Sequence, residues 1–328
     1  MSSTESTEAA VADPAPTVPA AGATADGETL RTVSLPGLSL TVRSRAPRAD
    51  GRAPALFVHG LGGSSQNWSA LMELLADEVG GEAVDLPGFG FSPPPDDGDY
   101  SINGHARAVV ALLESERRGP VHLVGNSMGG TIATRIAALR PDLVRTLTLV
   151  SPALPELPPQ RSAWPTALAS VPGLPRLYAR ATRDWSTQRR THALISLCYG
   201  DPSLISAEEF AEDAREYERR LALPYFWDAM VRSTRGLVNA YTLGGQHSLW
   251  RQAERVLAPT LLVYGGRDKL VSFRMAARAA KAFRDSRLLA IPDGGHVSMM
   301  EHPQLVARAL RDLLAEDHRV DDAPLDRS

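Results

Sequence analysis

Cysteine, long apolar runs and charge imbalance are all scarce in this chain of 328 residues. A single cysteine, Cys198, cannot form an internal disulfide, which is typical of proteins from a reducing compartment such as the cytoplasm. No run of roughly 18 apolar residues occurs, so we expect no membrane span. The net charge of −3 comes without any basic block, which argues against a nucleic-acid partner. These absences favour a cytoplasmic protein with a small-molecule partner, and they leave its oligomeric state open.

Several binding motifs are missing as well. No cysteine–histidine cluster has the spacing of metal ligands, and neither a P-loop nor a dinucleotide-binding fingerprint occurs. We therefore expect no metal and no cofactor. Residues 1–28 are rich in Ala, Pro, Thr and Ser and contain no Lys or Arg, so they predict a disordered tail rather than a signal peptide. A flexible tail is also expected over 316–328.

Between these tails, apolar runs alternate with helical patterns, which is typical of a mostly parallel sheet of about eight strands with helices on both faces. The predicted strands are 30–34, 38–43, 55–58, 82–85, 121–124, 146–150, 260–264 and 287–291. The predicted helices are 68–79, 101–117, 128–139, 272–284 and 303–315. A hydrophobic content of 43% can fill the core of such an α/β domain.

The alternation breaks over residues 152–250, where roughly 100 residues separate two predicted strands, far more than one crossover helix needs. Ser206 and Glu209 have the spacing of a capping box that opens a helix there. We predict a helical lid over 152–250 between two parts of the α/β core, 29–151 and 251–315. The aromatic residues of this insert are expected either to line a pocket or simply to pack: Trp164, Trp185, Tyr225, Phe226 and Trp227.

The most informative local pattern is Gly125-Asn126-Ser127-Met128-Gly129, a G-x-S-x-G motif. The apolar run 121–124 precedes it, and the helical pattern from 128 onward follows it. A strand, a sharp turn and a helix in this order form a nucleophile elbow, which raises the serine hydroxyl clear of the sheet. Ser127 is therefore the predicted nucleophile.

A serine nucleophile needs a base, and the base needs a residue that orients it. Among eight histidines, His296 follows the predicted strand 287–291 and lies in a glycine-containing loop. Asp268 follows the predicted strand 260–264 in the same manner. Loops at strand ends commonly carry catalytic side chains. His296 is thus the predicted base and Asp268 the residue that orients it.

Three other carboxylates compete with Asp268. Asp85 also ends an apolar run, but it precedes the serine in the chain. Asp293 and Glu301 lie close to His296 in sequence, which makes it hard for either to reach the far ring nitrogen.

A second glycine-rich loop follows the predicted strand 55–58 and begins with His59-Gly60-Leu61. Acyl transfer builds negative charge on a carbonyl oxygen, and backbone N–H groups can stabilise that charge. We expect these donors at Leu61 and Met128. A plain glycine turn is the alternative for this loop.

Together these motifs resemble the α/β-hydrolase superfamily over about residues 30–315. Besides the elbow and His59-Gly60, the resemblance covers Asp85-Leu86-Pro87-Gly88-Phe89-Gly90, Gly265-Gly266-Arg267-Asp268 and Gly295-His296. It implies an α/β-hydrolase fold with the residue order Ser127, Asp268, His296. Serine at 127 excludes the branches that need aspartate there.

The resemblance implies a lidded serine hydrolase, similar to carboxylesterases and lipases, that cleaves the ester of an apolar or aromatic molecule. Asn126-Ser127-Met128-Gly129-Gly130 is also similar to hydrolases of ring-fission products, so a carbon–carbon bond hydrolase acting on a vinylogous diketone is the first alternative. Val297 after the histidine departs from the tryptophan usual in that group. A non-catalytic binding protein on the same fold is the second alternative.

Overall fold

The computed structural model describes residues 27–156, 158, 160–164, 168, 171, 173–242 and 248–321. The predicted N-terminal tail lies outside these residues except for its last two positions. Of these, Glu28 is buried, and its carboxylate lies 2.7 Å from Arg43 Nη1. A buried guanidinium needs such a counter-ion. The prediction that the disordered tail extends to residue 28 is therefore wrong at Glu28.

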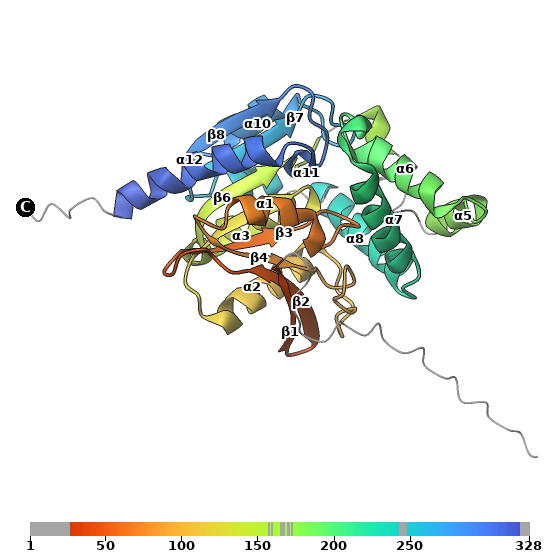
Figure 1. The fold of residues 1–328 in the computed structure, drawn as a ribbon, viewed down its shortest axis with the longest axis horizontal. Helices are drawn as coiled ribbons and strands as arrows, with labels where there is room; N and C mark the ends of the chain where they lie inside the picture. The colour runs from red at the N-terminus through yellow and green to blue at the C-terminus, as the bar shows by residue number, and fades with distance from the viewer. Residues whose placement is uncertain are drawn as a thin grey trace, which may run out of the picture.

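The described residues form one eight-stranded sheet in the order β1-β2-β4-β3-β5-β6-β7-β8. β1 and β2 form an antiparallel hairpin at one edge, β2 also pairs antiparallel with β4, and the other strands are parallel. In Figure 1 the hairpin lies at the bottom and β8 at the top. The strands are β1 (Thr29–Leu35), β2 (Leu38–Arg45), β3 (Pro54–Val58), β4 (Gly80–Val84), β5 (Val121–Asn126), β6 (Val144–Val150), β7 (Thr260–Gly265) and β8 (Ser286–Ile291).

Helices cover both faces of the sheet. Leu112 and Ile136 belong to an apolar cluster on one face with α9 and α10, whereas Leu71 and Leu310 belong to a cluster on the other. The core helices are α1 (Ser69–Leu74), α2 (Ile102–Glu116), α3 (Met128–Leu139), α9 (Leu249–Ala253), α10 (Met275–Ala282), α11 (Ser298–Glu301) and α12 (Pro303–Asp321). The predicted α/β class and its mostly parallel sheet are confirmed.

Two predicted helix ends are wrong. A 3₁₀-helix, η1 (Ser65–Trp68), precedes α1, and α1 ends at Leu74 rather than at 79 because the chain turns to enter β4 at Gly80. The last helix, α12, extends to Asp321, past the predicted end at 315 and into the expected flexible tail. An ion pair between Glu316 and Arg287 of β8 supports this extension.

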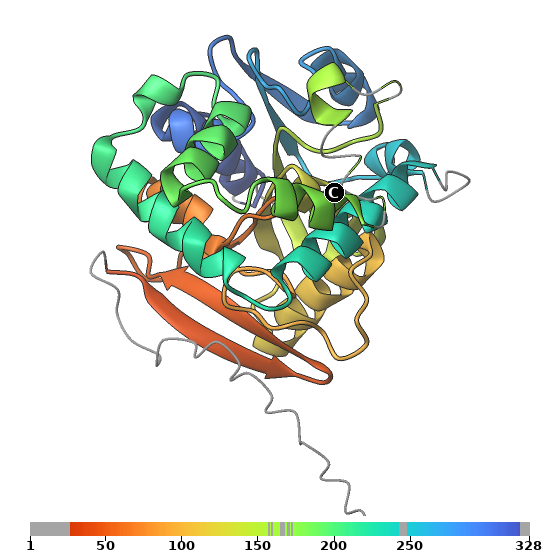
Figure 2. The ribbon, with the colours of Figure 1, turned by 90° about the vertical axis from the view of Figure 1, so that its right-hand side faces the viewer.

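Helices predominate in the described part of the insert, residues 152–250. They gather at one side of the molecule, at the right of Figure 1, and face the viewer in Figure 2. The insert helices are α5 (Leu174–Ala181), α6 (Thr187–Cys198), α7 (Ala207–Leu221) and α8 (Phe226–Thr242), with short 3₁₀-helices η3 (Arg161–Ala163) and η4 (Pro202–Leu204); η2 (Pro141–Leu143) lies in the core. The predicted capping box at Ser206 and Glu209 opens α7. No helix in the described ranges is apolar over enough length to cross a bilayer.

Candidate active site

Ser127 lies at the sharp turn between β5 and α3, with φ 52° and ψ −118°. A positive φ is strained for a residue other than glycine and often marks a functional position. The Ser127 N–H donates to the carbonyl of Val150 at 3.0 Å, which helps to hold the turn. A Cβ on Gly129 would lie 2.2 Å from the carbonyl oxygen of Val58, so this position needs glycine. The strand, turn and helix predicted from the motif are therefore all present.

His296 and Asp268 form a direct hydrogen bond. The two residues follow β8 and β7, and the His296 Nδ1 lies 2.9 Å from Asp268 Oδ2. Asp268 Oδ1 also accepts the backbone N–H groups of Leu270 at 2.7 Å and Val271 at 2.9 Å. Both members of the pair are almost fully buried. The carboxylate therefore fixes the orientation of the imidazole ring.

The electrostatics of Asp268 favour its charged form. Burial alone raises its pKa, but the charge of His296 and the hydrogen bonds from His296, Val271 and Leu270 outweigh burial. The pKa of Asp268 is therefore lower than its ordinary value. A carboxylate that stays ionised suits the role of orienting and stabilising a histidine that gains a proton.

Ser127 and His296 line the same cavity, whose volume is about 320 Å³. Among the described residues, no hydrogen bond joins the Ser127 hydroxyl to His296. Hydrogen bonds of this kind are often long in unliganded enzymes and shorten when substrate binds. The fold thus brings Ser127 and His296 to one cavity, and Asp268 contacts His296 from behind that wall.

The loop after β3 and the start of α3 present two backbone donors. Leu61 lines the cavity, and Met128 is the first residue of α3, where helical amides have no partner within the helix. Neither N–H has a hydrogen-bond partner in the part of the chain that the structure describes. The Arg220 guanidinium donates to the carbonyl of Gly62, which anchors the Leu61 loop to the insert.

Asn126 connects the elbow to the histidine loop. Its side-chain amide donates to the carbonyls of Val150 and His296, both at 3.0 Å. A Cβ on Gly60 would approach Asn126 Oδ1 to 2.9 Å, so glycine at 60 leaves room for this side chain. The sequence motif contains Asn126, but it does not predict that this side chain bridges two loops.

The rival carboxylates have other partners. Asp85 accepts the N–H groups of Ser65 at 2.6 Å and Phe91 at 2.9 Å, so it organises two loops. Glu301 accepts the N–H groups of Gly200 and Gly295, and thereby ties the insert to the histidine loop.

The third rival, Asp293, is exposed. The carboxylate in contact with the His296 ring is the predicted Asp268.

His59 of the glycine loop has a structural position. Its Nδ1 lies 2.7 Å from the Gly60 carbonyl, and its Nε2 accepts the N–H of Leu86 at 3.0 Å. Burial lowers the pKa of His59, which favours the neutral ring that this pattern requires. The ring therefore joins the Leu61 loop to the loop after β4.

The sequence did not predict which residues of the insert line this cavity. Thr191 and Asp213 line it from α6 and α7, together with Arg220. The Thr191 hydroxyl is buried and has no hydrogen-bond partner among the described residues. Among the aromatic candidates, Trp227 lines a different cavity, Trp164 is 49% exposed, and neither lines the one beside Ser127. Helical periodicity locates a helix face, but it does not tell which face meets the cavity.

The described ranges contain no group of three His, Cys, Asp or Glu side chains arranged to hold a metal ion.

The chain is similar in sequence to proteins that are named for several different activities. The chain is 29% identical over 267 residues to the dihydrolipoyllysine-residue acetyltransferase component of the acetoin cleaving system of Cupriavidus necator, covering 79% of this chain and 63% of that relative. The chain therefore spans less than two thirds of that relative. It is 26% identical over 287 residues to monoacylglycerol lipase ABHD6 of Bos taurus, covering 82% of this chain and 77% of the relative.

Solved structures show the same architecture. A putative lipase (lip1) from Acinetobacter baumannii AYE superposes with a TM-score of 0.74 at 20% identity, covering 90% of this chain and 93% of the other. At this identity the likeness shows the fold alone. The family model of the alpha/beta hydrolase fold matches residues 54–303, a range that contains Ser127, Asp268 and His296. The chain belongs to the alpha/beta hydrolase fold family.

Proposed function

We propose that this protein is a serine hydrolase that cleaves carboxylic esters of apolar or aromatic small molecules through an acyl-enzyme. The observation that carries the proposal is the 2.9 Å contact of Asp268 with His296, which lines the same cavity as Ser127. A nucleophile, a base and a group that orients the base are the parts that such chemistry requires.

In the first step, Ser127 Oγ attacks the carbonyl carbon of the ester. His296 Nε2 takes the hydroxyl proton, and Asp268 stabilises the imidazolium that forms at the other end of the ring. The carbonyl oxygen becomes an oxyanion, which the N–H groups of Leu61 and Met128 hold. These two amides suit this role because they have no partner among the described residues.

The tetrahedral intermediate then collapses. The bond to the alcohol oxygen breaks, and that oxygen takes its proton from His296, which leaves an acyl group on Ser127. A water molecule gives a proton to His296 and attacks the acyl carbon. The second intermediate expels Ser127 Oγ, which recovers the proton from His296, and the carboxylic acid leaves.

The insert acts as a lid in this proposal. Its helices α6 and α8 contribute apolar side chains to the cavity, among them Ile195, Met230 and Val238. The core adds Leu154 and Val271. A wall of this kind binds an apolar or aromatic group and excludes water from the reacting atoms.

Relatives support the ester bond as the target. One relative over most of this chain is named as a monoacylglycerol lipase, and its name implies hydrolysis of a glycerol ester. That match covers 82% of this chain.

Carbon–carbon bond hydrolysis has less support. An anionic diketone needs a cation near Ser127, but Arg220 is paired with Glu216 and donates to Gly62. Asp213 adds a further carboxylate to the same wall. This charge pattern favours a neutral ester beside Ser127.

A panel of chromogenic esters of increasing chain length, run beside a vinylogous diketone, tests the proposal. We expect turnover of the esters, no turnover of the diketone, and loss of activity in Ser127→Ala with the fold retained by circular dichroism. Faster turnover of the diketone would support the alternative. Ester turnover that persists in Ser127→Ala would refute the serine mechanism.

A further inference from the structure

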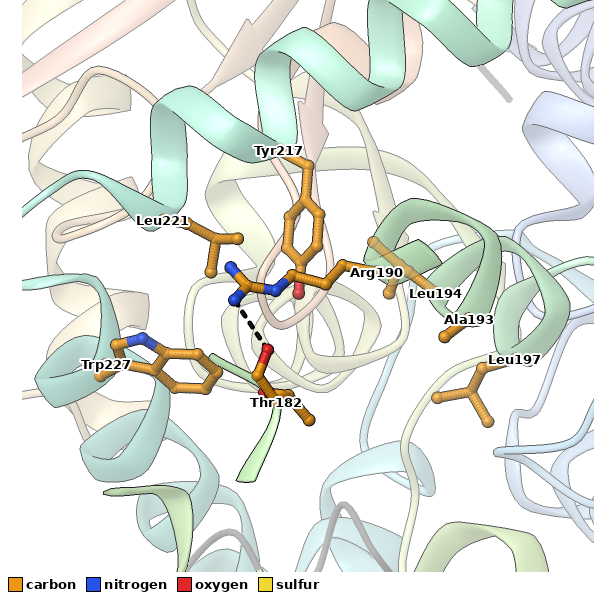
Figure 3. Close-up of a pocket in the computed structure, with 8 residues that line it drawn as sticks. All are labelled: Thr182, Arg190, Ala193, Leu194, Leu197, Tyr217, Leu221 and Trp227. Atoms are coloured by element: carbon orange, nitrogen blue, oxygen red, sulfur yellow. Dashed lines mark hydrogen bonds between the residues drawn. The ribbon is translucent and has the colours of Figure 1, made fainter. Parts of the chain in front are cut away.

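A second cavity lies within the insert, with a volume of about 210 Å³. Figure 3 shows it between α6, α7 and the start of α8, with the Arg190 side chain reaching across it. Its lining is mostly apolar and aromatic. The lining residues are Thr182, Arg190, Ala193, Leu194, Leu197, Tyr217, Leu221 and Trp227.

Helix α6 separates this second cavity from the one beside Ser127. Thr191 and Ile195 line only the cavity beside Ser127, whereas Arg190 lines only the second cavity. Leu194 and Leu197 line both. Residues three and four apart lie on one helix face, so the two leucines form the edge at which the cavities meet. Side chains without a polar contact of their own can change rotamer and let a chain pass.

Helix α7 repeats the same division. Asp213 and Arg220 line the cavity beside Ser127, and Tyr217 and Leu221 line the second cavity. The two cavities are therefore neighbours along a shared pair of helices rather than separate features of the surface.

Arg190 gives the second cavity its charge. Its Nη2 donates to the carbonyls of Thr182 at 2.8 Å and Arg183 at 3.1 Å, which fixes the guanidinium in place. Its Nε is buried and has no hydrogen-bond partner among the described residues. No carboxylate pairs with Arg190 in those residues either. The Arg190 side chain is partly buried, so the cavity reaches its guanidinium. A buried N–H without a partner is costly, and an anionic ligand would satisfy it.

The charges of the two cavities differ in sign. Asp213 and Glu156 line the cavity beside Ser127 together with Arg220, and none of the described residues that line the second cavity is acidic. The surrounding sequence from 157 to 200 contains six arginines and one acidic residue, Asp184. The acidic residues of α7 offset this excess over the insert as a whole. The charge that favours an anion in the second cavity is therefore the guanidinium of Arg190 itself.

We propose that the second cavity binds the far end of the substrate and that this end is anionic. The substrate class is then an ester whose apolar chain passes Leu194 and Leu197 and ends in a carboxylate or a similar anion beside Arg190. The assignment of substrate class rests on the ester hydrolysis proposed above. It makes Arg190 a residue that determines specificity and takes no part in bond breaking.

Two chromogenic esters of equal length test this inference. One is 4-nitrophenyl octanoate, and the other is the 4-nitrophenyl half-ester of octanedioic acid, which differs in its terminal carboxylate. We expect the full-length wild-type protein to prefer the half-ester. In Arg190→Gln, the KM for the half-ester should rise about tenfold or more, with kcat nearly unchanged, because a charge-assisted hydrogen bond is lost. Kinetics with the octanoate should stay within about twofold of wild type.

Arg189→Gln is the matched control. The Arg189 guanidinium lies 4.1 Å from the ring centre of Trp185, and the residue lines neither cavity. This variant removes the same charge from the same helix and should change neither KM. Arg190→Lys should restore part of the preference, since it keeps the cation.

Several results would overturn the inference. These are a wild-type protein that discriminates against the half-ester, equal changes of KM for both esters in Arg190→Gln, or equal effects of Arg189→Gln and Arg190→Gln. The variant Ser127→Ala distinguishes a failure of the inference about Arg190 from a failure of the proposed serine mechanism. Turnover that survives in Ser127→Ala would refute the serine mechanism, whatever the Arg190 variants show.

Discussion

Asn126 donates a hydrogen bond from Nδ2 to the backbone carbonyl of His296 at 3.0 Å, and so joins the residue before the candidate nucleophile to the candidate base. The same amide nitrogen also donates to Val150 at the end of β6. One buried side chain thus sets the separation of two loops that lie 170 positions apart in the chain.

Asn126→Ala should lower kcat with little effect on KM. The variant leaves the His296 carbonyl without this donor, and an unsatisfied buried group costs about 1–3 kcal/mol. The Val150 carbonyl keeps the N–H of Ser127. We expect a lower melting temperature and a loss of kcat greater than that of Ser298→Ala, which removes one hydrogen bond within the histidine loop. Equal kcat values for the two variants would mean that Asn126 supports the fold without positioning the base.

Asp268→Asn should lower kcat by roughly a thousandfold to ten-thousandfold, because an amide cannot stabilise the histidine cation in the same way. Asp85→Asn is the control. Its carboxylate binds backbone N–H groups of two other loops, so the variant should lose stability but keep kcat within about tenfold. Steady-state kinetics with one chromogenic ester measure both. A larger loss of kcat in Asp85→Asn would overturn the assignment of Asp268.

Asp213 should make stability depend on pH. Burial raises its pKa from 3.8 to about 6. An acid with a higher pKa in the folded state loses stability as the pH rises from its unfolded pKa to its folded pKa. The amide in Asp213→Asn cannot ionise. The melting temperature of the variant minus that of wild type should therefore increase between pH 4 and pH 6 and stay constant above pH 6.

Glu212→Gln is the control for that titration, since Glu212 is an exposed neighbour on α7. The melting temperature should rise less in Glu212→Gln than in Asp213→Asn, because the carboxylate that it removes is not buried. A constant difference from wild type for Asp213→Asn would show that the carboxyl group at 213 titrates at its ordinary pKa.

Much of this site follows from local sequence patterns. A Cβ at position 129 would collide with β3, so the elbow requires glycine there. A five-residue motif shows this glycine, and the motif therefore predicts the elbow. His296 and Asp268 each follow a strand, and parallel strands bring their ends to one edge of the sheet. Strand positions and residue order are therefore enough to predict which side chains meet.

The substrate cavity could not be predicted in the same way. Asp213 and Arg220 lie on α7, whose capping box was predicted, but a capping box does not show which polar residues face the cavity. Arg190 was one of several arginines in the insert, and its place in a second cavity depends on how α6 packs on α7. The end of α12 was missed because the ion pair of Glu316 with Arg287 joins residues far apart in the chain.

Trp227→Ala should shift the preferred acyl chain toward longer esters, because it enlarges the second cavity. Turnover of a small acetate ester should stay within about tenfold of wild type, since the acetyl group does not reach that cavity. Trp164→Ala is the control, as Trp164 is half-exposed and lines neither cavity. An identical chain-length profile in the Trp227 variant and wild type would contradict a role for the second cavity in acyl selection.

Covalent labelling tests most directly whether Ser127 is the nucleophile. A fluorophosphonate probe should add one label per chain, and peptide mass spectrometry should place it on Ser127, because His296 and Asp268 activate that hydroxyl. Asp268→Asn should label more slowly, and Ser127→Ala should not label at all. Absence of label on the wild-type protein, or a label that persists in Ser127→Ala, would contradict the account.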